Sequence, residues 1–280
     1  MRTKISRIFS LLCLPLAFWA CGDDSSSGAS DDDYSADSSS SVIPGTDRES
    51  SGSENLKTAW DYLNPDIDYG EFTDARDGQT YRTVKIGEQI WMAQNLNYAY
   101  NEPTVTEDSS SFCFGNAPDS CAKHGRLYLW SAAMDSAAVF SDNGKGCGYG
   151  STCSASGTVR GVCPEGWHLP SYDEWDALLT AVGGSSTAGM MLKSQTGWKS
   201  YSGVPAGSDA YGFSALPAGY RHVNNGDFHD AGYSAFFRSS SEGNSDGAYS
   251  MFLYYDYEDA CLGNYYKLDA FSVRCLKNSN

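Results

Sequence analysis

The sequence predicts an α+β domain with short antiparallel sheets, two main helices and long loops, preceded by a disordered N-terminal tether. Three observations support this fold class. A capped, one-sided helix pattern occupies residues 171–182. Short apolar runs alternate with Gly and Asn turn residues in residues 79–94 and again in the final third. Residues 21–55 are dominated by Ser, Asp and other polar residues.

The first 20 residues have the layout of an export signal. A basic start precedes an apolar core, Ile8 to Trp19, that is too short to span a bilayer as a permanent helix. Ala20 before Cys21 is similar to a bacterial lipobox, which predicts that Cys21 becomes the lipid-bearing first residue. The alternative is an ordinary signal peptide with a chance cysteine.

Residues 21–55 follow as a Ser- and Asp-rich linker, and residues 56–280 show no composition break, which predicts one domain on a disordered tether. The net charge of −16 argues against nucleic acid or acidic lipid as partners, because binding phosphate requires clustered Lys and Arg. Acidic residues directly after a lipidated Cys also resemble the surface-export signals of some Gram-negative lipoproteins. The expected location is therefore the outer membrane, with the domain exposed at the cell surface.

Export makes disulfides the default state of the domain's cysteines. Apart from Cys13 and Cys21, seven cysteines remain, and none has the CxxC spacing that many zinc sites use. We assign three pairs and one leftover thiol: Cys113 with Cys121, Cys147 with Cys153, Cys163 with Cys275, and Cys261 alone. Spacing by itself does not determine this connectivity. The longest pair would close a loop of about 112 residues and stabilise the fold by roughly 4 to 5 kcal/mol.

The N-terminal part of the domain predicts a short helix and then strands. Residues 56–64 have apolar residues at near-helical spacing and end before a proline. The Asp77-Gly78 dipeptide is typical of a hairpin turn, and residues 81–96 predict two strands joined at Gly87-Glu88. We expect the apolar side chains of these two strands to share one face: Val84, Ile86, Ile90 and Met92.

Residues 101–121 are expected to form a loop closed by a disulfide, followed by a helix within residues 125–137. The apolar face of that helix consists of Leu127, Trp130, Ala133 and Met134. Residues 142–161 are dense in Gly and Ser and predict a constrained surface loop.

The strongest helix signal lies at residues 171–182. Ser171 and Glu174 can form a capping box, in which each side chain accepts a hydrogen bond from the backbone N–H of the other residue. Gly183 and Gly184 then permit the left-handed turn that ends the helix. The apolar face consists of Trp175, Leu178, Leu179 and Val182. A shorter helix is expected over residues 187–197, and antiparallel strands fill the final third.

Seven sequence blocks stand out in this order: DGQTYRTVKIGEQIWMAQNLNY, GRLYLWSAAM, VCPEGWHLPSYDEWDALL, LKSQTGW, GSDAYGFSALPAGYR, SSSE and FSVRCLK. Together they closely resemble the Fibrobacter succinogenes major paralogous domain, from about Glu71 to Lys277. More distantly, HLPSYDEW with a terminal VRC is similar to the formylglycine-generating-enzyme branch of the C-type-lectin-like fold. This second resemblance implies a compact domain in which an N-terminal strand meets the C-terminal strand. It also implies that Cys163 and Cys275 correspond to the long-range disulfide that braces such folds.

Residues with catalytic potential do not form a recognisable catalytic pattern. No GxSxG motif occurs, the acidic residues are too scattered to indicate a glycosidase pair, and the calcium-binding motifs of sugar-binding lectins are absent. We interpret His168 as structural, and His222 and His229 as parts of a solvated loop rather than a metal site. The sequence therefore favours a non-catalytic protein without cofactor or metal. The alternative is an oxidase or modifying enzyme on a diverged formylglycine-generating-enzyme-like scaffold.

Aromatic residues are the one surplus feature, with 19 Tyr and 7 Trp. Amphipathic rings suit contact surfaces, which leads to four candidate ligand-contact residues: Tyr201, Tyr254, Tyr257 and Tyr265. The alternative is that these rings are the half-buried filling of a short-stranded fold. The sequence thus predicts a cell-surface binding or adhesion module whose partner is a plant-wall polysaccharide or another surface protein.

Overall fold

Strands from distant parts of the chain meet in the first sheet. The computed structural model describes residues 56–103, 110–153, 155–223 and 225–279, all within one compact unit. In the described residues the sheet has five strands, in the order β1 (Gly70–Thr73), β2 (Thr80–Ile86), β3 (Gln89–Met92), β13 (Leu276–Lys277) and β6 (Trp167–His168). β13 pairs antiparallel with β3, placing Leu276 opposite Trp91. The expected meeting of an N-terminal and a C-terminal strand is therefore present.

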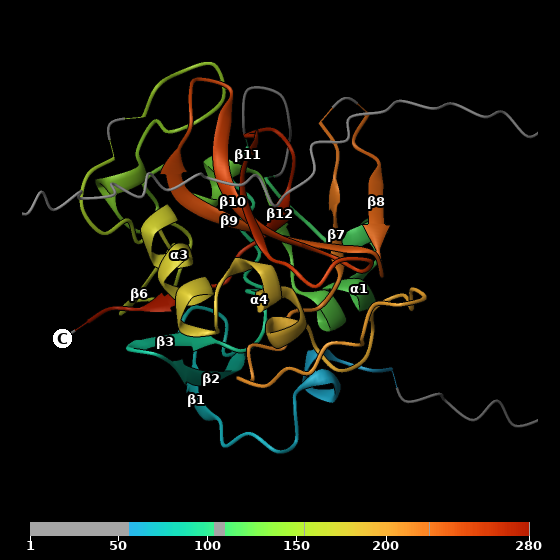
Figure 1. Ribbon diagram of the computed structural model, residues 1–280. Coiled ribbons are helices and arrows are strands. Elements are labelled where there is room, and N and C mark those ends of the chain that lie inside the picture. The colour runs from blue at the N-terminus through green and yellow to red at the C-terminus, as the bar shows by residue number, and fades with distance from the viewer. Residues whose placement is uncertain (1–55, 104–109, 154, 224, 280) are drawn as a thin grey trace, which may run out of the picture. The chain divides into compact units, whose positions relative to one another are not determined.

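The second sheet contains most of the C-terminal third and is centred on three long antiparallel strands, β9 to β11 (Figure 1). Its order is β11 (Cys261–Tyr266), β10 (Gly247–Tyr254), β9 (Ser234–Glu242), β12 (Phe271–Ser272), β5 (Leu127–Tyr128) and β4 (Ser111–Phe112), with the hairpin of β7 (Ala218–Arg221) and β8 (Phe228–Ala231) attached to β9. The predicted antiparallel strands of the final third are thus confirmed, although β12 and β7 each meet β9 in parallel.

The two longest helices of the described residues, α3 (Tyr172–Ala181) and α4 (Ser185–Leu192), lie between the two sheets (Figure 1). The shorter helical segments are η1 (Ala59–Tyr62), η2 (Phe114–Asn116), α1 (Pro118–His124), α2 (Trp130–Ala133) and η3 (Asp142–Gly144). This mixture of segregated helices and mainly antiparallel strands confirms the α+β fold class.

Helix α3 begins as the sequence predicts. The backbone N–H of Ser171 donates to Glu174 at 2.8 Å, and the N–H of Glu174 donates to the Ser171 hydroxyl at 3.3 Å. The four apolar side chains of its inner face are at most 3% exposed. Gly183 and Gly184 follow with φ angles of 107° and 99°, in a region that glycine adopts without strain.

One core cluster joins both sheets to both helices. Trp175 from α3 is fully buried, with its ring centroid 4.7 Å from Trp91 of the first sheet and 5.9 Å from Phe237 of the second. Because Trp175 of α3 contacts both sheets, this helix joins the first sheet to the second.

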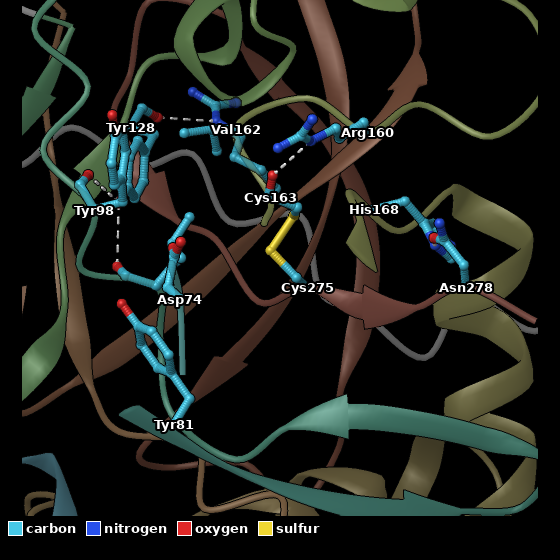
Figure 2. The surroundings of a disulfide bond; sticks show 12 residues. Asp74, Tyr81, Tyr98, Tyr128, Arg160, Val162, Cys163, His168, Cys275 and Asn278 are labelled. Atoms are coloured by element: carbon cyan, nitrogen blue, oxygen red, sulfur yellow. Dashed lines mark hydrogen bonds between the residues drawn. A yellow bond between two sulfur atoms is a disulfide. The ribbon is translucent and has the colours of Figure 1, made fainter. Parts of the chain in front are cut away.

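The segment leading into α3 is tied to the end of the described chain (Figure 2). Cys163 forms a disulfide with Cys275, and Arg160 donates from Nε to the Cys163 carbonyl at 3.1 Å. His168 Nδ1 lies 2.7 Å from Asn278 Oδ1, and His168 Nε2 lies 2.9 Å from Glu174 Oε1. The capping residue of α3 therefore also holds the histidine that precedes the helix.

Two further disulfides close short loops in the described residues: Cys113 with Cys121 and Cys147 with Cys153. These are the pairs assigned from the sequence. Cys261 is also disulfide-bonded, so the expectation that it is the leftover free thiol is wrong. The predicted signal peptide, the lipidation site at Cys21 and the tether lie outside the described residues.

The shared apolar face expected for β2 and β3 is wrong. The two-residue turn places Val84 directly opposite Trp91, and directly opposed residues face the same side of a sheet. Val84 and Ile86 therefore face one side, and Ile90 and Met92 face the other.

The helix expected within residues 125–137 is only the single turn α2. Leu127 and Tyr128 form a strand instead, because β12 pairs with them. A helix occurs earlier, as α1, where a loop was expected. Pro118 occupies its first position, where its missing N–H costs no hydrogen bond.

We expect Trp175→Ala to lower the free energy of unfolding by about 3 kcal/mol or more, because a cavity would open where three layers meet. Urea unfolding measures this change. Asp176→Ala, an exposed position on the same helix, is the matched control and should stay within about 0.5 kcal/mol of wild type. A Trp175→Ala protein as stable as wild type would contradict the assigned role of this ring.

His168 should make the domain's stability depend on pH. Burial disfavours the imidazolium, but the hydrogen bonds and charge of Glu174 and the bond to Asn278 outweigh it, so the pKa of His168 is raised above 6.5. The side chain of Glu174 is only partly buried, and its burial would raise the pKa of the carboxyl, yet His168 and Ser171 hold this pKa below the ordinary value.

A raised histidine pKa stabilises the folded state fully below the unfolded pKa, and this contribution is lost as pH rises through the folded pKa. The difference in unfolding free energy between wild type and His168→Gln should therefore be largest below about pH 6.5 and shrink at alkaline pH. Urea unfolding across a pH series checks this, with His229→Gln in the exposed hairpin as control. A pH-independent difference would refute the ion pair.

Candidate functional site

The long connection between α4 and β7 encloses a cleft of about 320 Å³. Residues 193–201 and 204–207 line it, together with Tyr255 from the end of β10. Because Trp198, Tyr201 and Tyr255 are among the lining residues, we call it the aromatic cleft.

Backbone hydrogen bonds close the cleft segment at its base. The N–H of Ser194 donates to the Ala215 carbonyl at 3.0 Å, and the N–H of Lys199 donates to the Gly232 carbonyl at 2.8 Å. Gly207 approaches the opposite strand of the loop so closely that an added Cβ would lie 2.5 Å from the Lys193 carbonyl oxygen. The wall of the cleft is therefore built on fixed backbone contacts rather than on side chains alone.

Three tyrosines from separate segments form a ring system at the cleft. The rings of Tyr201 and Tyr255 have centroids 5.6 Å apart at an angle of 87°, and those of Tyr233 and Tyr255 are 5.1 Å apart at 82°. These edge-to-face contacts are a favourable geometry for aromatic pairs. Tyr201 is 52% exposed and Tyr233 is 41% exposed. Tyr255 thus contacts two exposed rings, those of Tyr201 and Tyr233.

Trp198 and Lys193 form the inner part of the cleft. The indole N–H of Trp198 donates to the Ala215 carbonyl at 2.9 Å, which fixes the ring. The ammonium of Lys193 lies 5.0 Å from the centre of this ring and donates to the Tyr257 carbonyl at 2.6 Å. Burial lowers the pKa of Lys193 to about 8, although Asp259, Asp256 and Glu258 oppose the change.

The four predicted ligand-contact tyrosines separate into two groups. Tyr201 lines the aromatic cleft, and the backbone of Tyr257 borders it through Lys193, with the Tyr257 side chain 54% exposed. Tyr254 and Tyr265 pack into a different aromatic cluster, around the buried Phe236 and other rings of the second sheet. The two groups meet where the rings of Tyr254 and Tyr257 lie with centroids 6.5 Å apart.

Sequence reasoning missed Tyr255 as a cleft residue and Tyr233 as its neighbour. Successive residues of a strand face opposite sides, so the sequence of residues 251–256 does not by itself determine which side chains face the core. The structure places Met251 and Leu253 against the helices and Phe252 in the second aromatic cluster, so both sides of β10 are covered. Tyr255 follows the end of this strand, and no local pattern marks it as a partner of Tyr201.

Residues 84–277, well over half of this chain, match the Fibrobacter succinogenes major domain. The chain belongs to this family. No curated protein and no solved structure matches it. The more distant likeness to the C-type-lectin-like fold stays a prediction.

The part of the chain that matches the Fibrobacter succinogenes major domain includes the complete aromatic cleft, since residues 193–201, 204–207 and Tyr255 all fall within it. Membership of this family supports a surface-associated domain without specifying a ligand.

The histidines considered as catalytic or metal-binding residues contact other side chains of the fold. In the described ranges, no set of three or more His, Cys, Asp or Glu side chains is placed to hold a metal ion. His168 is paired with Glu174 and Asn278, and His222 and His229 lie with ring centroids 6.1 Å apart in the β7–β8 hairpin. None of the helices in the described residues has the length and apolar character needed to cross a bilayer.

Proposed function

We propose that this protein is a surface-exposed lipoprotein of the outer membrane that binds polysaccharide through the aromatic cleft and has no catalytic role. The observation that carries the proposal is the contact of two exposed rings, Tyr201 and Tyr233, with Tyr255 in the wall of the cleft. Pyranose rings present flat C–H faces, which pack on aromatic rings, while their hydroxyls need hydrogen-bonding groups around them.

The cleft also supplies the polar groups that a sugar requires. Gln195, Lys199 and Ser200 are exposed and line the same cavity as Tyr201. The centroids of the Tyr201 and Tyr233 rings lie 5.6 Å and 5.1 Å from that of Tyr255, so three rings are available to sugar units within one site. Plant-wall polysaccharides are the class we propose, with adhesion as the result of binding.

The anchor completes the proposal. A lipid on Cys21 and a polar tether over residues 21–55 would hold the cleft away from the membrane, where it can reach an insoluble polymer. We expect protease treatment of intact cells to remove the domain while a periplasmic marker stays intact. A domain that survives until the outer membrane is permeabilised would show that it does not face outward.

Substitutions of the exposed rings should weaken binding without loss of fold. We expect Tyr201→Ala and Tyr233→Ala each to lower affinity for a bound polysaccharide roughly tenfold, because each removes one stacking surface. Pull-down of the purified chain with cellulose, xylan, mannan and pectin measures this. Tyr266→Ala, 58% exposed but outside the cleft, is the matched control and should bind like wild type.

Two results would contradict the proposed function. Wild-type protein that binds none of the four polymers would exclude the polysaccharide as partner and favour another surface protein. Equal loss of binding in Tyr266→Ala and in the cleft variants would show that the contact is not at the cleft.

A further inference from the structure

A second cavity, of about 640 Å³, lies at the turn between β9 and β10. Residues 244–247 of this turn line it, together with Asn264, Tyr265 and Tyr266 of β11. None of these residues lines the aromatic cleft. Asn264 is exposed and Tyr266 is 58% exposed, so a ligand from solution can reach both side chains. We call this site the turn cavity.

The pairing of β10 with β11 places these two side chains on one face. Gly247 lies directly opposite Tyr266, and Tyr249 lies directly opposite Asn264. Residues two apart in a strand face the same side of a sheet, so Asn264 and Tyr266 project together, with Cα atoms about 7 Å apart. Because Gly247 has no side chain, the Tyr266 ring meets no side chain from its cross-strand partner. The ring is therefore open to a ligand in the cavity.

Asn264 supplies an acceptor in a defined position. A Cβ added to Gly243 would lie 2.5 Å from Asn264 Oδ1, and one added to Gly247 would lie closer still, so only glycine leaves room for this amide. Among the described residues, no hydrogen bond joins the Asn264 side chain to another protein group. Its oxygen is therefore available to a donor from solution.

Asp246 contributes a carboxylate to the same cavity. Its Oδ1 accepts from the Ser245 hydroxyl at 3.1 Å, and no described residue donates to its Oδ2. The ammonium of Lys267 does not compensate this charge, because Lys267 is 1% exposed and pairs with Glu242. The turn cavity thus carries a negative charge of its own, which disfavours anions and attracts cations.

An ammonium group fits this set of groups better than a hydroxyl does. It has three hydrogens to donate, so it can bond to the Asp246 carboxylate and to Asn264 Oδ1 at the same time, whereas a hydroxyl has only one. Its charge strengthens the bond to the carboxylate, and a cation is attracted to the face of an aromatic ring such as Tyr266. We propose that the turn cavity binds a small organic ammonium ion, such as the protonated amine of an amino sugar, at a site separate from the aromatic cleft.

NMR titration of the ¹⁵N-labelled full chain at about pH 6, where amines are protonated, tests the proposal. The probes are D-glucosamine, N-acetyl-D-glucosamine, in which the same amine is a neutral amide, and D-glucose. We expect saturable shifts of the Asn264 side-chain amide and of residues 244–247 with glucosamine at millimolar concentration, and binding roughly tenfold weaker or undetectable for the other two probes. Added salt should weaken glucosamine binding, because it screens exposed charges.

Variants separate the charge from the ring. Asp246→Asn removes the charge with little change of shape and should weaken glucosamine binding roughly tenfold or more. Tyr266→Leu keeps an apolar side chain but removes the ring and should weaken it about threefold. Glu88→Gln is the matched control, since it removes one negative charge from a 96% exposed side chain outside the cavity, and it should bind like wild type. Thermal unfolding verifies that all three variants fold.

The two proposals fail independently. Cellulose, xylan, mannan and pectin carry no amine, so Asp246→Asn and Tyr266→Ala should keep polysaccharide binding. The Tyr201→Ala, Tyr233→Ala double variant should keep glucosamine binding.

Four outcomes would overturn the ammonium site. The first is wild-type protein that does not bind glucosamine. Equal affinity for glucosamine and N-acetylglucosamine would remove the role of the charge. An equal loss of binding in Glu88→Gln and Asp246→Asn would reduce the effect to the net charge of the protein. Glucosamine binding that survives in folded Asp246→Asn but is lost in the tyrosine double variant would place the amine in the aromatic cleft.

Discussion

Buried cations that donate to backbone carbonyls hold the long loops of this domain in place. Arg238, Lys267 and Arg274 are each at most 1% exposed, and each lies over a buried aromatic ring. A fold with short strands leaves many carbonyls outside its ladders, and buried carbonyls need donors. The acceptors of these three cations include the carbonyls of Tyr128, Tyr266 and Asp269 for Arg238, of Gly148, Ser151 and Ser245 for Lys267, and of Phe213 for Arg274.

These contacts determine how the loops are held. Lys267 pairs with Glu242 and holds the loop that Cys147 and Cys153 close, so that loop is fixed by a charge as well as by a disulfide. Burial lowers the pKa values of Arg238 and Arg274 to about 9, partly opposed by nearby carboxylates, which leaves both charged at neutral pH. Arg274 also donates to the Phe213 carbonyl, in the segment that runs from the aromatic cleft toward β7. A rigid frame of this kind allows exposed aromatic rings to lie on loops and still keep a defined geometry.

The aromatic residues divide between this frame and its surface. Phe236 and the rings around it, including Tyr254 and Tyr265, cover one face of the second sheet, whereas Tyr201 and Tyr255 line the aromatic cleft and Tyr233 packs on Tyr255. Tyr254 and Tyr265 are therefore half-buried parts of the fold, as the second interpretation of the tyrosine surplus predicts.

The sequence by itself determined the features that neighbouring residues create. Ser171 and Glu174 are three residues apart, and Gly87-Glu88 joins adjacent strands, so capping and turn chemistry are sufficient to predict them. Only the tertiary structure decided that Leu127 and Tyr128 form a strand, because their partner is β12, far along the chain. The same holds for the grouping of Tyr201 with Tyr233 and Tyr255. Contacts between distant segments depend on chain topology, which residue spacing does not specify.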